Sequence, residues 1–141
     1  MTSRIVVDTS VFISALISPS GPSREVIRLC LSRQYQPILG NALFSEYESV
    51  VFRSDIFDQC SLTEEEILEL FQAFLKVSEW VNIYFLWRPN LRDEADNHLI
   101  ELALAGGASS IVTNNLKDFQ NAELLFPKLS ILKPEVMIRN R

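Results

Sequence analysis

Short apolar runs alternate with amphipathic segments along this chain, and that alternation is the strongest constraint on its fold. Runs rich in Ile, Val and Leu predict buried strands, here over 4–7, 35–39, 81–86, 110–113 and 129–132. Helical spacing of apolar residues occurs between them, over 11–16, 23–32, 42–52, 64–78 and 94–105, with a weaker pattern over 135–139. The order predicts an α/β fold with a mainly parallel sheet of these five strands and helices on both faces.

The length and composition favour one globular domain spanning residues 1–141. The 48% hydrophobic and 22% charged residues are typical of soluble domains, and the length suffices to bury a core. Asp8 interrupts the first apolar run after Val7, and no apolar run approaches a membrane span, so we expect a cytoplasmic protein without a membrane partner. Cys30 and Cys60 lack metal-site or redox spacing, and we expect both to be reduced.

The net charge of −5 by itself argues against a nucleic-acid partner, but the distribution of the charges weakens that argument. Residues 55–79 hold seven acids and one base, Lys76, so this segment contributes −6 and the remainder +1. Three consecutive glutamates follow Thr63, a pattern typical of a helix N-terminus. The acidity is therefore local and leaves nucleic-acid chemistry open.

Polar residues follow the first and fourth predicted strands. Asp8 comes directly after residues 4–7, and Thr113 ends the run at 110–113. In parallel sheets the functional crevice lies at the carboxyl ends of the strands, where the strand order reverses, so both residues belong to that edge. Taken alone, Asp8 is best explained as a cap of the helix that follows it.

Glu46 lies at the border of the apolar arc predicted for the helix after Asn41, whereas Glu48 lies well outside that arc and is expected in solvent. Glu46 alone is compatible with a boundary acid whose carboxylate reaches water.

Asp96 is the most informative acid. It shares a helical stripe with Leu99, Ile100 and Ala103, which directs its carboxylate toward the sheet. The alternative is that Asp93 caps this helix and Asp96 complements its dipole. The same periodicity predicts that His98, the only histidine, points away with Glu101, so a catalytic triad lacks its usual base.

A polar segment after the fourth strand, 113–119, contributes the amide of Asn115 and the carboxylate of Asp118. A plain polar turn would explain it. Together with Asp8, Glu46 and Asp96, however, oxygen ligands from four elements converge on one sheet edge, and hard oxygen ligands of this kind suit Mg²⁺ or Mn²⁺.

At these residues the chain resembles the PIN-domain nucleases, in particular the VapC-like toxins of toxin-antitoxin modules, over nearly its whole length. The motifs are Asp8-Thr9-Ser10, Glu46, Asp96-x-x-Leu-Ile-x-x-Ala followed by Gly106-Gly107, and Thr113-x-Asn115-x-x-Asp118-Phe119. The resemblance implies catalytic metal ligands at Asp8, Glu46 and Asp96, with a fourth position shared by Asp118 and Asn115. Supporting residues would be Thr9, Ser10, Asp93 and Thr113.

The resemblance also implies Mg²⁺- or Mn²⁺-dependent cleavage of single-stranded RNA, a small antitoxin protein as partner, and a homodimer. Ser10 departs from the Asn common in the family, and Asn115 from a common Asp. Basic residues that flank the motifs and are placed to contact RNA phosphates are Arg88, Arg92 and Lys117. An apolar band around Ile67, Leu70, Phe71, Phe74, Leu75 and Trp80 fits either the core or a dimer interface.

Three other interpretations stay open at this point. A PIN nuclease could process RNA without an antitoxin. An aspartyl phosphotransferase would also place Asp8 after the first strand, but it normally carries a second Asp where this chain has Ser10. A non-catalytic binding module would use Asp8 and Asp96 only as helix caps.

Overall fold

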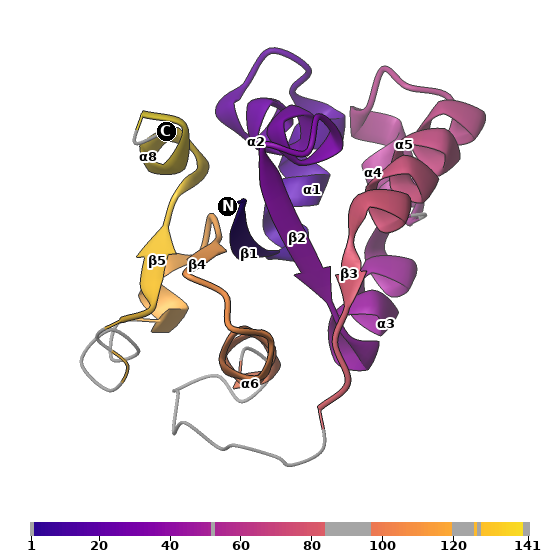
Figure 1. The fold of residues 1–141 in the computed structure, drawn as a ribbon. Helices are drawn as coiled ribbons and strands as arrows, with labels where there is room; N and C mark the ends of the chain where they lie inside the picture. Colours follow the sequence, from indigo (N-terminus) through magenta and orange to yellow (C-terminus); the bar gives the residue numbers. More distant parts are fainter. Residues whose placement is uncertain (1, 52, 84–96, 120–125, 127, 140–141) are drawn as a thin grey trace.

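The computed structural model describes residues 2–51, 53–83, 97–119, 126 and 128–139, and within them the strands form one sheet in the order β3-β2-β1-β4-β5 (Figure 1). Every pairing is parallel. The strands are β1 (Ser3–Val7), β2 (Tyr35–Leu39), β3 (Glu79–Trp80), β4 (Ser110–Val112) and β5 (Ser130–Leu132). The predicted α/β fold with a parallel sheet is confirmed.

Helices connect successive strands. They are α1 (Thr9–Ile17), α2 (Pro22–Leu31), α3 (Asn41–Val51), α4 (Ser54–Gln59), α5 (Glu64–Val77), α6 (Asn97–Gly106), the 3₁₀ helix η2 (Leu116–Phe119) and α8 (Pro134–Arg139). Because crossovers between parallel strands are right-handed, the change of direction after β3 places α6 on the face opposite α1 to α5, packed on β1, β2 and β4. Among the described residues, no helix combines the length and the apolar character that crossing a bilayer requires.

The strand order reverses between β1 and β4. The chain leaves β1 toward β2 and β3 and then returns to pair β4 against the other side of β1, with Val7 opposite Val112. The backbone N–H of Asp8 donates to the carbonyl of Val112 at 2.9 Å, which extends this pairing past the end of β1. The residues that follow the two strands, Asp8 and Thr113, are therefore neighbours at the switch point of the sheet.

The edge strand and one helix after β2 differ from the sequence-based prediction. The strand expected at 81–86 is wrong: β3 is Glu79–Trp80, residues 81–83 carry no strand, and 84–86 lie outside the described residues. Pairing with Ile38 and Leu39 of β2, rather than apolar content, defines this short edge strand. Helix α4 was not predicted, because six residues are too few to show a clear helical period.

The end of α6 follows the Gly106-Gly107 stop signal. A Cβ on Gly106 would lie 2.5 Å from Cδ1 at the end of the Ile38 side chain, so a larger residue would require that side chain to move. Gly107 has a φ of +68°, the left-handed conformation that ends helices. The Arg4 side chain donates to the Gly106 carbonyl at 2.6 Å and so caps the negative end of the helix.

The apolar band of α5 is mostly core. Ile67, Phe71 and Phe74 are buried, and the helix begins after Thr63, as the acidic run predicted. Thr63 and Glu66 form a capping box at that end. Trp80 is the member of the band with a large exposed fraction, 46%.

Burial raises the pKa of the Cys30 thiol to about 12, and Cys30 and Cys60 are both free, as expected.

Tyr47 ties α3 to the end of β1. Its ring is fully buried and packs edge-on against Phe12, and its hydroxyl donates to the carbonyl of Val7 at 2.7 Å. Burial, followed by the negative charge of Asp8, raises the pKa of this hydroxyl well above its usual value. The contact anchors the residue immediately before Asp8.

We predict that Tyr47→Phe lowers the free energy of unfolding by about 1–2 kcal/mol at pH 7, because a buried hydrogen bond is lost. A second effect appears at high pH. The folded pKa of Tyr47 lies above its unfolded value of about 10, so its contribution is complete below pH 10 and is lost as the pH rises further. Urea unfolding between pH 8 and 11 should therefore show a steeper alkaline decline for the wild type than for the variant. Parallel declines would contradict the assignment.

Candidate functional site

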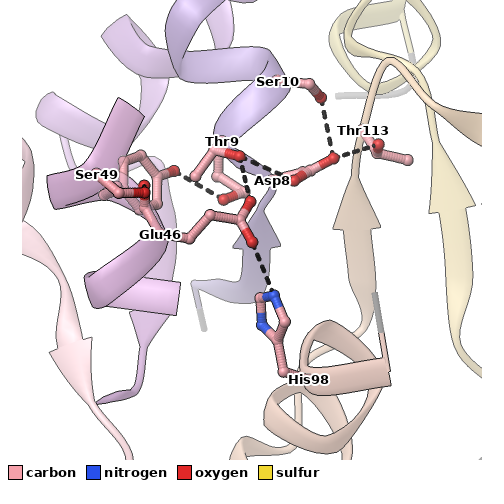
Figure 2. A network of polar contacts seen from close by, with 9 residues as sticks. Asp8, Thr9, Ser10, Glu46, Ser49, His98 and Thr113 are labelled. Atoms are coloured by element: carbon pink, nitrogen blue, oxygen red, sulfur yellow. Dashed lines mark hydrogen bonds and ion pairs between the residues drawn. The ribbon is translucent and has the colours of Figure 1, made fainter. Parts of the chain in front are cut away.

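Asp8 is buried at the carboxyl end of β1, with 3% of its surface exposed. It occupies the N-cap position of α1, but its side chain makes no capping hydrogen bond. The capping interpretation, which the sequence left open, therefore does not describe this carboxylate. Its oxygens instead face hydroxyl groups of neighbouring residues (Figure 2).

Two hydroxyls donate to the same oxygen of Asp8. The hydroxyls of Ser10 and Thr113 lie 3.0 and 2.7 Å from Oδ2. Each hydroxyl also accepts a backbone N–H, from Asn114 and Asn115 respectively. Because a backbone N–H can only donate, both hydroxyl protons are directed at Asp8, and the two lone pairs of Oδ2 are used.

Among the residues that the structure describes, the Thr9 hydroxyl is the side-chain group that faces the other oxygen, Oδ1. The Thr9 hydroxyl lies 3.4 Å from Oδ1 of Asp8 but only 2.5 Å from Oε1 of Glu46. A hydroxyl has one proton to donate, and the shorter contact indicates that Thr9 donates it in a hydrogen bond to Glu46. The network thus turns Oδ2 of Asp8 toward the protein and leaves Oδ1 open on the side of Glu46.

Glu46 joins the two helical layers at the sheet edge. Its Oε1 accepts from Thr9 of α1, and its Oε2 lies 3.0 Å from Nε2 of His98 on α6. The hydrogen bond from His98 lowers the pKa of Glu46; burial opposes this shift, and Thr9 adds to it. Figure 2 shows the carboxylate between the threonine and the imidazole.

The predicted orientation of His98 is wrong. The side chain is 18% exposed and faces Glu46, and Glu101, also expected in solvent, is 6% exposed. The helical period located the sheet-facing stripe of α6 correctly at Leu99, Ile100 and Ala103, all buried. It could not reveal that α3 also contacts α6 and covers a second side of that helix.

The remaining candidates divide into two groups. Asn115 and Lys117 are exposed, and the Asn115 backbone N–H supports Thr113 at 2.9 Å. Outside the residues and side chains that the structure describes lie Asp93, Asp96, Arg88, Arg92 and the carboxylate of Asp118. Glu48 is exposed, as expected.

The described oxygen donors fit a hard divalent cation. Asp8 and Glu46 carry open lone pairs on adjoining carboxylates, and Mg²⁺ is commonly held by one or two carboxylates together with waters and substrate phosphates. Within the described ranges, no group of three or more Asp, Glu, His or Cys side chains is placed to hold a metal ion. Asp8 and Glu46 are therefore the described members of the expected ligand set.

Comparison with known proteins agrees with this architecture. The family model described as the PIN domain matches residues 4–117. A solved structure of VapBC2 from Rickettsia felis bound to a DNA fragment from their promoter contains a similar chain, with a TM-score of 0.61 and 17% sequence identity. The similarity covers 92% of this chain and 98% of that one. Among curated proteins, none shows significant similarity.

We predict that Thr113→Val lowers the free energy of unfolding by about 1–3 kcal/mol, because it removes a fully buried hydroxyl that bonds both Asp8 and the Asn115 backbone. Thr113→Ser keeps the hydroxyl and is the matched control. Chemical denaturation of the three proteins measures the difference. Equal stability of the Val and Ser variants would show that the Thr113 hydroxyl does not hold Asp8.

Proposed function

This chain belongs to the PIN domain family, whose members are generally nucleases, and on that premise we propose that it is a divalent-metal-dependent nuclease that cleaves single-stranded RNA. The observation that carries the proposal is the meeting of Asp8 and Glu46 across the Thr9 hydroxyl at the switch point of the sheet. Two carboxylates beside one buried hydroxyl destabilise the folded state by charge repulsion unless a cation offsets their charge.

Each residue has a proposed role. Asp8, Glu46 and Asp96 would hold the Mg²⁺ or Mn²⁺ ion, with Asp118 or Asn115 at the fourth position. A divalent ion at such a site lowers the pKa of water and offsets phosphate charge. Asp93 is proposed as a supporting residue on sequence grounds.

The hydroxyl network orients the ligands. Ser10 and Thr113 fix one oxygen of Asp8 so that Oδ1 faces the site, and Thr9 keeps Glu46 beside it. Lys117, together with Arg88 and Arg92 from the sequence, is proposed to contact RNA phosphates. Without the cation, the carboxylates of Asp8 and Glu46 would repel RNA phosphates, so binding of RNA and of metal should be linked.

We further propose that the protein is the toxin of a toxin-antitoxin module, with a small antitoxin as partner. The similar chain in the solved VapBC2 structure supports this assignment at the level of fold. Trp80, which is exposed at the edge strand beside Phe44, offers apolar surface for the homodimer that the family resemblance implies. Growth arrest on expression in bacteria, absent for Asp8→Asn, would separate the toxin from an RNA-processing nuclease.

We predict that the purified protein cleaves labelled single-stranded RNA in Mg²⁺ or Mn²⁺ and not in excess chelator. Asp8→Asn and Glu46→Gln should reduce cleavage to the level in chelator, since each removes a charged ligand while preserving shape. Glu48→Gln, an exposed change on the same helix, should cleave like the wild type.

Gel analysis of RNA and of single-stranded DNA with the same sequence tests the substrate. Cleavage that persists in chelator, or that survives in Asp8→Asn, would refute the metal-dependent mechanism. Cleavage of the DNA alone would refute the assignment of RNA as substrate.

Asp96 can be tested without a substrate. If its carboxylate adjoins Asp8 and Glu46, Asp96→Asn relieves repulsion in chelator and should melt a few degrees higher, for about 1 kcal/mol. The wild type should gain more stability from Mg²⁺ than the variant does, because a ligand of the folded state shifts unfolding by mass action. A lower melting temperature with an unchanged Mg²⁺ shift would instead identify Asp96 as a residue that only complements the helix dipole.

A further inference from the structure

We propose that His98 is a positioning residue that fixes the Glu46 carboxylate from the opposite helical layer and thereby raises the affinity of the site for a divalent cation. The inference rests on the proposed metal-dependent function. It assigns a role to the one histidine of the chain, which the helical pattern had directed away from the site.

Glu46 needs external support. Unlike Asp8, which lies at a strand end and is 3% exposed, Glu46 projects from α3 on a longer side chain that is 33% exposed. Ordering such a side chain costs rotamer entropy when the metal binds, unless the protein has already ordered it.

The two contacts of Glu46 act on different atoms. Thr9 bonds Oε1 from α1, and His98 bonds Oε2 from α6 (Figure 2). One partner alone would leave the carboxylate free to rotate about its terminal bond, whereas two partners on separate oxygens fix its plane. With these two partners, which are the ones given by the described residues, each oxygen retains one lone pair for a cation.

The imidazole suits this task. Its Nδ1 is buried and has no hydrogen-bond partner among the described residues. Within that part of the chain, the ring therefore makes its hydrogen bond to Glu46, through Nε2. The contact is also a side-chain bridge between α3 and α6, two helices that lie on opposite faces of the sheet and meet beyond its edge. Removing the ring therefore releases Glu46 without changing any proposed metal ligand.

The test is the affinity of the full chain for Mn²⁺ alone, with free Mn²⁺ measured by electron paramagnetic resonance. Partners that orient metal ligands typically contribute about 10–100-fold to affinity, and we expect His98→Ala to raise the Kd by about 10-fold. His98→Gln places an amide N–H where Nε2 lies and should recover most of that loss. His98→Asn is shorter, places its amide near the Nδ1 position, and should behave like His98→Ala.

Leu104→Ala, a change at the exposed far end of α6, is the control for effects on the helix and should bind like the wild type. If His98→Ala does not fold, the Gln and Asn variants decide the question. Equal Kd values for the Gln and Asn variants, or tighter Mn²⁺ binding when the ring is removed, would overturn the positioning role of His98. If Glu46→Gln weakens Mn²⁺ binding in the same experiments, the proposed metal site itself still stands. Absence of Mn²⁺ binding by the wild type would overturn the proposed function, and this inference with it.

Discussion

The parallel pairing of β4 against β1 is the contact on which the rest of the site depends. Val7 lies opposite Val112, so the two strands end together and the residues that follow them are neighbours. A shift of one residue in this register would turn Asp8 or Thr113 to the other face of the sheet and separate the carboxylate from the hydroxyl that lies 2.7 Å from it. Burial of both strands restricts such shifts, because a shift would move the buried apolar residues at their carboxyl ends out of the core. The core and the candidate site thus share one constraint.

The second constraint is the direction in which the hydroxyls of Ser10 and Thr113 donate their protons. Backbone N–H groups of Asn114 and Asn115 oblige the hydroxyls of Ser10 and Thr113 to donate to a single oxygen of Asp8. A buried carboxylate is stable only where it is hydrogen-bonded, and here that requirement also orients it. The Ser10 hydroxyl thereby links Asp8 to the loop after β4.

Much of this arrangement follows from the sequence, because the short β-branched runs and the helical periods between them are strong local signals. They predicted the α/β fold, the place of Asp8 and Thr113 at one sheet edge, and the border position of Glu46. They failed where tertiary contacts decide. His98 was directed to solvent because a helical period identifies one buried stripe and not a second layer such as α3. The strand at 81–86 was misplaced because pairing with β2, not apolar content, sets the bounds of an edge strand. Asp8 occupies the N-cap position of α1, but its side chain makes no capping hydrogen bond. A sequence pattern indicates the position and cannot show whether the hydrogen bond forms.

The central claim is that the switch point between β1 and β4 holds a divalent cation on Asp8 and Glu46. Anomalous X-ray diffraction from a crystal of this protein soaked in Mn²⁺ tests that claim most directly, because it locates the ion without assuming its ligands. We expect an anomalous peak within coordination distance of Asp8 Oδ1 and the Glu46 carboxylate, on the side of Asp8 opposite Ser10 and Thr113. A fully soaked crystal with no peak at these two carboxylates, or with its strongest peak elsewhere, would contradict it.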